Sequence, residues 1–249
     1  MKFADAPASP ADRMTGGGPV KRWSFSTLDN FEACPKRVWF RTVQRVKVPP
    51  NDAMMRGNRV HDGLEKYLRG QVDFPDAALS EVAHVQFWLE RLAPWRGLAI
   101  MEPRWGLDAT WAPTGWWDDE TWLWAKPDLV GLDIHDPAGS ELTIVDFKTG
   151  KSYGKQLKHM RQLLVYAAAA LSRYPSVQTF SLHVWYIDEK DDSLDRQIDR
   201  GAVQSFRARI HAQGMALTSE TEFPATPSPR VCNWCDYRDV CDDAWRKTK

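Results

Sequence analysis

The chain has 249 residues, no formal net charge at pH 7 and 43% hydrophobic residues. This length fits one large domain with a sizeable buried core, or one core with a small appendage. A neutral chain has no overall positive field, so any binding to nucleic acid must come from a local basic patch. No run of about 18 apolar residues is present, so no membrane-spanning helix is expected.

The first 22 residues are rich in Ala, Pro, Gly and Asp and contain no apolar segment of the kind found in signal peptides. They predict a flexible tail on a cytoplasmic protein. In that reducing compartment structural disulfides are rare, so the cysteines are expected to be free or to bind a metal. Their positions are uneven, with one cysteine near the start of the chain and three near its end: Cys34, Cys232, Cys235 and Cys241.

Helical patterns come first in chain order. Ser24 or Ser26 can cap a helix over about 27–46, which Pro35 should kink or restart. The segment 55–70 carries an apolar stripe at helical spacing and ends at a glycine. A third helix is expected over about 76–92, closed by a proline.

Strand-like residues then occupy 98–111 and 120–135, and a third strand, 141–149, is nearly all apolar, as expected of a strand buried on both faces. A helix over 155–173, a strand over 177–188 and a helix over 199–217 follow. The order helix, three strands, helix, strand, helix predicts an α/β fold with a central sheet flanked by helices.

The stretch "TIVDFKTGKS", residues 143–152, has two interpretations. Its end resembles a phosphate-binding loop, but such a loop needs a glycine five residues before Gly150, where the chain has Val145. A nucleotide-hydrolysing enzyme is therefore disfavoured, and Gly150 is better explained as a turn that leaves the strand.

The other interpretation is a metal site. The two-residue period of a strand places Asp146 and Lys148 on one face. If the strand that contains Asp128 pairs with this one, Asp128 and Asp146 can converge on one divalent cation. Lys148 can then polarise a water or stabilise charge on the phosphorane. A lone Asp-x-Lys is more often a surface ion pair, so other positions must support this interpretation.

Five pieces of sequence supply that support, in this order: "SFSTLDNFEACPKRVWF", "GNRVH", "PDLVG", "VDFKTG" and "QLLVY". Together they resemble the motifs of the PD-(D/E)XK nuclease superfamily, and within it those of the RecB-like and CRISPR-associated RecB-like exonucleases. The resemblance implies a restriction-endonuclease-like core, a mixed sheet flanked by helices. It predicts a single nuclease domain over 23–249, with its core at about 57–217.

The resemblance also assigns roles. His61, Asp128 and Asp146 would hold Mg²⁺ or Mn²⁺, with the Phe147 carbonyl as a further ligand, and Lys148 would assist the attack of water. A second pair on the following helix, Gln162 and Tyr166, would face the site, although as i,i+4 neighbours they could simply be packing. Glu102 is either an accessory acid or a strand-start residue.

The cysteine pattern resembles that of iron–sulfur members of the same superfamily. Four thiolates suit a 4Fe–4S cluster, and they also suit structural zinc, which spacing cannot distinguish. The resemblance favours the cluster, with zinc as the runner-up. The cluster would join the segments 26–46 and 230–246.

The predicted function is therefore a Mg- or Mn-dependent DNA exonuclease acting on single-stranded or free ends, in recombination, repair, phage DNA processing or CRISPR adaptation. A catalytically weak DNA-end-binding or scaffold subunit is the alternative. A helicase or recombination protein is a possible partner, because no motor fits in this length, and no membrane partner is expected. The basic residues considered for DNA contact form two groups: Lys36, Arg37, Arg41 and Arg45; and Lys151, Lys155, Lys158 and Arg161. Solvated helix faces are the alternative, and the second group, beside the metal site, is favoured for contact with the DNA backbone. Trp234 or Tyr237 could stack on a base, but packing around the cysteine site is favoured for both.

Overall fold

The computed structural model describes residues 17–73, 81–132, 139–190 and 193–246. The chain divides into two compact units. The unit that we call the sheet unit comprises residues 50–105 and 125–208, and the cysteine unit comprises 1–49, 106–124 and 209–249. Most of the predicted N-terminal tail lies outside the described residues, but Val20 is fully buried, so the packed part of the cysteine unit begins before Trp23.

A five-stranded mixed sheet forms the centre of the sheet unit, in the order β1-β5-β6-β7-β8. The only parallel pair among these described strands is β6 with β7, and the other neighbours are antiparallel. The central strand β6 is buried over most of its length, as its apolar sequence predicts. The bounds of the strands are β1 Ile100–Met101, β5 Leu129–Leu132, β6 Glu141–Lys148, β7 Thr179–Tyr186 and β8 Ser193–Asp199.

The strand β8 was not predicted from the sequence. Its sequence, "SLDRQID", has no clear apolar–polar alternation, and its side chains are mostly exposed or half-buried. It lies at the edge of the sheet, where a strand needs only one neighbour and charged side chains protect the free edge. Such a strand is stabilised by its pairing with β7 rather than by its own composition.

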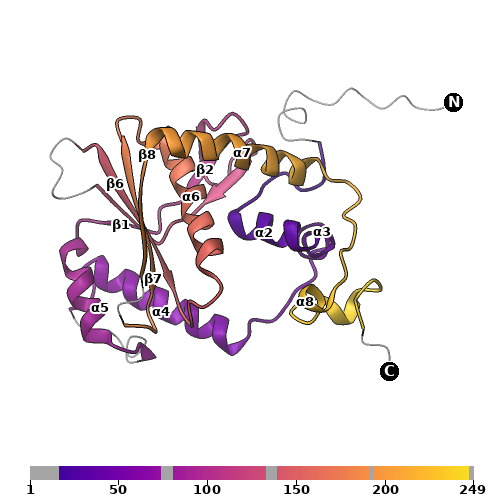
Figure 1. Cartoon of the computed structure of the whole chain (residues 1–249), viewed down its shortest axis with the longest axis horizontal. Helices are drawn as coiled ribbons and strands as arrows, with labels where there is room; N and C mark the ends of the chain where they lie inside the picture. The colour runs from indigo at the N-terminus through magenta and orange to yellow at the C-terminus, as the bar shows by residue number, and fades with distance from the viewer. Residues whose placement is uncertain (1–16, 74–80, 133–138, 191–192, 247–249) are drawn as a thin grey trace. The chain divides into compact units, whose positions relative to one another are not determined.

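Helices cover both faces of this sheet (Figure 1). Helices α4 (Asp52–Leu68) and α5 (Val85–Leu92) share a buried apolar cluster with Val145 and Phe147 of β6. The alternate residues of β6 point to the opposite face, where α6 (Gln156–Arg173) lies. Within the described residues, the third predicted helix begins only at Val85, and residues 74–80 lie outside them.

The cysteine unit contains short helices and a small sheet of order β3-β2-β4. As predicted, the first helix restarts at Pro35: α2 ends at Ala33 and Cys34 is extended, with φ −167° and ψ 109°. The last turn is a π-helix that ends at Val43 instead of near residue 46. The bounds are α2 Phe25–Ala33, α3 Pro35–Val38, η1 Trp39–Val43, β2 Trp105–Leu107, β3 Pro113–Thr114, β4 Leu123–Ala125, α8 Pro229–Cys232 and η4 Arg238–Val240.

Tryptophans form much of the core of this unit. Trp23 and Trp122 are fully buried and meet edge to face, with ring centroids 5.2 Å apart. Helix α7 (Arg200–Ser219) is shared between the two units of the chain, and its residue 214 is a glycine beside these rings. A Cβ on Gly214 would lie 2.7 Å from atoms of both rings, so no larger residue fits.

The α/β class and the mixed sheet flanked by helices agree with the predicted fold. None of the described helices is long and apolar enough to cross a membrane.

Candidate active site

The strand that follows Asp128 pairs with the strand that contains Asp146, as the sequence suggested. Strands β5 and β6 are antiparallel, with Leu129 opposite Val145, so Asp128 stands opposite Asp146 at the end of the ladder. The Phe147 backbone N–H donates to Asp128 Oδ2 over 2.6 Å. The two carboxylates therefore lie at the same end of the β5–β6 pair.

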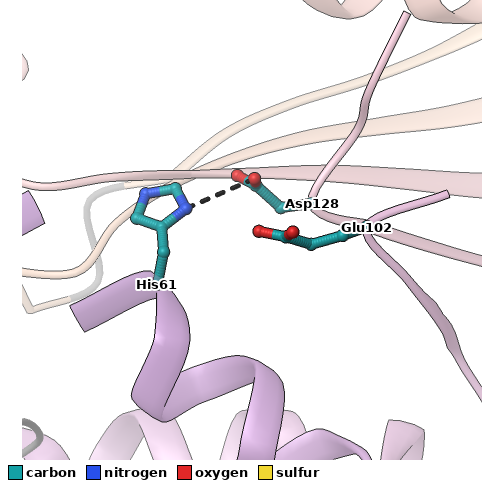
Figure 2. Close-up of side chains that lie close together, drawn as sticks. All are labelled: His61, Glu102 and Asp128. Carbon is teal, nitrogen blue, oxygen red and sulfur yellow. Dashed lines mark ion pairs between the residues drawn. The ribbon is translucent and has the colours of Figure 1, made fainter. Parts of the chain in front are cut away.

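His61 and Glu102 lie beside Asp128 at this end of the strands. Figure 2 shows the His61 side chain on α4 pointing toward Asp128, which precedes β5, with Glu102, which follows β1, beside it. One ligand atom from each of the three residues lies within 4.8 Å of the others, and His61 Nδ1 is 3.3 Å from Asp128 Oδ1. The Glu102 N–H also donates to the Asp128 carbonyl over 2.9 Å. These three residues are a candidate metal group, and Asp146 is not one of them.

Asp146 belongs to a neighbouring network with Lys148 and the helix α6. Asp146 Oδ2 forms an ion pair with Lys148 Nζ. Gln162 lies between the two, since its Nε2 donates to Asp146 Oδ1 over 3.0 Å and its Oε1 accepts from Lys148 over 3.1 Å. The Tyr166 hydroxyl accepts a second bond from Gln162 Nε2, at 2.6 Å. Thus Gln162 and Tyr166 contact the site residues rather than only the core.

The electrostatics of the site reflect several charges buried together. Burial would lower the pKa of His61, but the charge of Asp128 and its hydrogen bond raise it. Burial would raise the pKa of Asp128, but the charge and hydrogen bond of His61 lower it. Burial opposes the charged form of Lys148, yet the charge of Asp146 raises the pKa of that lysine.

Asp146 and Tyr166 respond mainly to burial. Burial raises the pKa of Asp146 to about 6 in spite of Lys148, and Asp128 adds to the rise. Burial and the same carboxylates raise the pKa of Tyr166 well above its usual value, so this hydroxyl stays protonated. A divalent cation bound beside both carboxylates would offset the repulsion that Asp128 exerts on the charged form of Asp146.

A cavity of about 730 Å³ opens onto this group. Four carboxylates line it, Asp62, Glu65, Glu102 and Asp128, against one cationic side chain, Lys126, which pairs with Glu102. The cavity is therefore acidic and suits a cation rather than a bare phosphate. On its α4 side, a Cβ on Gly57 would lie 3.2 Å from Thr149 Oγ1, so this glycine lets the helix approach the end of β6.

The chain after β6 makes a braced turn. Gly150 has φ +88°, a left-handed conformation that favours glycine. Its N–H donates to Asp188 Oδ2 over 2.6 Å, and Asp188 also accepts two bonds from Arg56 of α4, at 2.8 and 2.6 Å. Val145, where a phosphate-binding loop needs its first glycine, is fully buried inside β6. This turn is therefore not such a loop, in agreement with the sequence.

Two parts of this arrangement were not assigned from the sequence. Glu102 could not be distinguished from an ordinary strand-start residue, and its positive φ of 48° is the feature that marks it. The pair formed by Arg56 and Asp188 carried no local signal, because the two residues are brought together by packing of α4 against the end of β7.

The four cysteines lie in the cysteine unit as free thiols and line one small cavity. Figure 1 shows α8 beside α3. Two backbone N–H groups donate to sulfur: Thr226 to Cys34 Sγ over 3.5 Å and Trp245 to Cys232 Sγ over 3.3 Å. No three of the sulfurs approach one another within 4.8 Å, unlike the ligand atoms of the group around His61. The structure therefore does not show the predicted cysteine-ligated cluster.

The structure separates the residues that were considered for DNA contact. Lys151, Lys155 and Lys158 are exposed in the sheet unit, and Arg161 is half-buried. In the cysteine unit, Tyr237 is buried and stacked on Phe40, with centroids 5.4 Å apart, so packing accounts for it. Trp234 is 83% exposed, which contradicts the expectation that it packs around the cysteines.

Comparison with known proteins agrees with this geometry. A crystal structure of a candidate exonuclease from Eubacterium rectale superposes with a TM-score of 0.53, over 100% of this chain and 96% of the other. The two share 12% sequence identity, so the likeness shows the fold alone. A search of curated proteins found no match. The model of the PD-(D/E)XK nuclease superfamily matches residues 22–242. The chain therefore belongs to the PD-(D/E)XK nuclease superfamily.

Proposed function

We propose that the protein is a Mg- or Mn-dependent deoxyribonuclease that degrades DNA from free, single-stranded ends. The observation that carries this proposal is that Asp128, Asp146 and Lys148 lie together at one end of the β5–β6 pair. His61 and Glu102 lie beside Asp128. Membership of a nuclease superfamily makes a phosphodiester the expected substrate.

The donor atoms fit a hard divalent cation. His61, Glu102 and Asp128 offer one imidazole nitrogen and carboxylate oxygens within 4.8 Å, which suits Mn²⁺ and, through the oxygens, Mg²⁺. Asp146 Oδ2 is buried, and its contact among the described residues is the ion pair with Lys148. We propose Asp146 and the Phe147 carbonyl as further ligands. A bound cation would polarise the phosphate and lower the pKa of a coordinated water.

Lys148 is proposed as the catalytic residue that holds the attacking water and stabilises charge on the phosphorane. Its ammonium is fixed between Asp146 and Gln162, so it needs little reorganisation during the reaction. Gln162 is proposed to position the lysine, and Tyr166 to position Gln162 through its hydroxyl. The pKa of Lys148 is raised, so the proposed role is that of a charged donor rather than a base.

The preference for ends rests on the family resemblance, and the similar structure is described as a candidate exonuclease. We place the activity in recombination, repair, phage DNA processing or CRISPR adaptation, with a helicase or recombination protein to separate the strands. Lys151 and Lys155, exposed just after β6, are proposed to contact the DNA backbone near the site.

We propose that the four cysteines hold a 4Fe–4S cluster, with structural zinc as the alternative. Support comes from their sharing one cavity and from N–H donors to Cys34 and Cys232, since such bonds are typical around cluster thiolates. Burial raises the pKa of the Cys235 thiol, and the charge of Arg37, on the same cavity, partly opposes that rise. The cluster would tie α3 to the end of the chain within the cysteine unit.

The test is digestion of end-labelled single- and double-stranded DNA with Mn²⁺ and with EDTA, using protein purified with and without oxygen. Lys148→Ala should lower the rate by roughly 100-fold or more, since it removes charge stabilisation at the phosphate. Lys190→Ala, which removes an exposed lysine with no proposed role in catalysis or DNA contact, is the matched control. Wild-type rates from Lys148→Ala would refute the assignment, and binding to DNA ends without cleavage would favour a scaffold role.

A further inference from the structure

A second large cavity lies in the cysteine unit, and its charge is opposite to that of the cavity at His61. It has a volume of about 710 Å³, within the range of roughly 300–1,000 Å³ usual for ligand sites. Four cationic side chains line it, Lys21, Arg22, Arg41 and Arg45, against one carboxylate, Asp119. The lining therefore carries three net positive charges, four minus one.

Part of this cavity is held in a fixed arrangement. The Arg22 guanidinium donates to the carbonyls of Thr121 and Asp118, at 3.2 and 2.8 Å, and to Asp119 Oδ1 at 3.4 Å. The same guanidinium lies over the Trp124 ring, 5.5 Å from its centroid. A cation and an aromatic ring are thus set side by side before any ligand arrives, which lowers the entropy lost on binding.

Trp124 belongs to a cluster of three tryptophans. It stacks on Trp116 with centroids 5.5 Å apart, and its Nε1 donates to the Trp116 carbonyl over 2.7 Å. Trp117 meets Trp124 edge to face at 6.0 Å and is 71% exposed. An indole held by neighbouring rings and open to solvent is a ready platform for a planar ligand.

The other two arginines have charges that the described residues do not neutralise. Arg41 and Arg45 are exposed, and neither forms an ion pair within the described part of the chain. Arg45 also has a φ of 55°, which a long side chain rarely adopts, and its neighbour Val46 anchors the turn through a bond to the Phe40 carbonyl. The turn thus holds Arg45 at the cavity in spite of the strain.

The basic residues of the first helical region therefore divide into two sets. Lys36 pairs with Asp243, and Arg37 lines the cysteine cavity. Arg41 and Arg45 belong instead to the cationic cavity. Four residues with hydroxyl groups also line it and can donate to phosphate oxygens: Ser24, Ser26, Thr27 and Thr42.

We infer that this cavity binds the backbone of a single-stranded nucleic acid, with Trp117 stacking on one of its bases. Spread cations and hydroxyls match a chain of phosphates, and an exposed indole can stack only on a base whose face is not covered by duplex neighbours. The inference rests on the proposed nuclease function, because the acidic cavity at His61 lacks the positive charge to retain a strand by itself.

The experiment measures binding separately from cleavage. Full-length protein in EDTA is titrated into a fluorescein-labelled oligothymidylate, and anisotropy is recorded at several salt concentrations. The double variant Arg41→Ala with Arg45→Ala should weaken binding at least tenfold and reduce the slope of log K against log salt by about 1.4, or 0.7 for each lost phosphate contact. Trp117→Ala should weaken binding roughly tenfold and leave the salt slope unchanged.

The matched control is the double variant Lys190→Ala with Arg196→Ala, which removes the same charge from exposed positions of the sheet unit. It should bind as the wild type does. Equal affinity of the Arg41/Arg45 variant and the wild type would overturn the inference, as would equal competition by polyglutamate, which would indicate an acidic protein partner.

Hydrolysis of bis(p-nitrophenyl) phosphate with Mn²⁺ distinguishes the two proposals, because so small a diester does not need a strand-binding cavity. The Arg41/Arg45 variant should retain this hydrolysis. If the wild type binds the oligothymidylate through the cavity but hydrolyses no diester, the nuclease proposal fails and the binding site stands.

Discussion

Lys148 Nζ donates a hydrogen bond of 3.1 Å to Gln162 Oε1. An ammonium can only donate and an ionised carboxylate can only accept, so the Gln162 amide has one orientation that satisfies both Lys148 and Asp146. The amide therefore braces the ion pair that Lys148 forms with Asp146. A side chain of the same size without these hydrogen bonds would leave Lys148 held by Asp146 alone.

We expect Gln162→Met to lower kcat by roughly 10- to 100-fold with little change in KM, because it keeps the volume of the side chain but releases Lys148. Steady-state hydrolysis of oligonucleotides measures both constants. Gln156→Met, in the first turn of the same helix, should have no effect. A change confined to KM would indicate a role in substrate binding instead.

Glu102 is expected to be a metal ligand. Glu102→Gln should raise the Mn²⁺ concentration needed for half-maximal activity by at least about tenfold, because it replaces a charged ligand by a neutral one. It should also reduce the rise in melting temperature that Mn²⁺ produces without substrate. Asp62→Asn is a close control, since Asp62 lines the same cavity but pairs with Lys66 outside the metal group. Equal Mn²⁺ dependence of Glu102→Gln and wild type would exclude this role.

The bidentate pair of Arg56 and Asp188 is expected to stabilise the sheet unit. Asp188→Asn should reduce the free energy of unfolding at pH 7 by about 1–3 kcal/mol, since it weakens charge-assisted bonds from Arg56 and from the Gly150 N–H. Asp73→Asn removes an ion pair of an almost fully exposed carboxylate and should change stability much less. Chemical denaturation of the three proteins measures the difference.

The Asp188 contribution should depend on pH. Burial would raise the pKa of Asp188, but the Arg56 and Gly150 hydrogen bonds and the Arg56 charge lower it overall. A carboxylate with a lowered folded-state pKa stabilises the protein above the pKa of the unfolded chain, about 3.9, and loses this effect as the pH falls through the folded value. The gap between wild type and Asp188→Asn should thus be widest at neutral pH and shrink below about pH 4. A constant gap across this range would contradict the assignment.

Cys235→Ala is expected to act first on stability. The proposed cluster would cross-link Cys34 to the distant cysteines and close a long loop, which would stabilise the fold by on the order of 4 kcal/mol by analogy with disulfides. The melting temperature should therefore fall on the order of 10 °C, together with loss of visible absorbance and of bound iron. Trp234→Ala removes the adjacent, 83% exposed side chain and should leave both unchanged. Loss of the metal with an unchanged melting temperature would refute the stabilising role, and zinc in place of iron would identify the alternative site.

Patterns between near neighbours in the chain predicted much of the fold. The apolar run of β6 predicted a buried strand, and its period of two placed Asp146 and Lys148 together on the α6 face. Pro35 predicted the break between α2 and α3. These features depend on the backbone conformation and solvation of a short segment, so the order of residues in that segment is enough to predict them.

Features that depend on a neighbour from elsewhere in the chain were missed or left open. The edge strand β8 exists because β7 offers it a partner, and its own residues carry no strand pattern. Trp234 and Tyr237 have similar aromatic character, yet Tyr237 meets Phe40 and Trp234 faces solvent. The basic residues after Cys34 looked like one group until packing assigned them to two cavities.

The candidate metal group shows the same division. His61, Asp128 and Asp146 were predicted as metal ligands from motifs, because each type of side chain has a chemical use at that motif, and the structure brings His61 and Asp128 together with Glu102. The role of Glu102 could not be predicted in this way, since a glutamate before a strand has no distinguishing local pattern. Its carboxylate comes within 4.8 Å of the other ligand atoms because β1 pairs with β5 and α4 packs on the same sheet. The sequence determines which side chains are available for a site, but the distances between side chains remote in sequence follow from how the strands and helices pack.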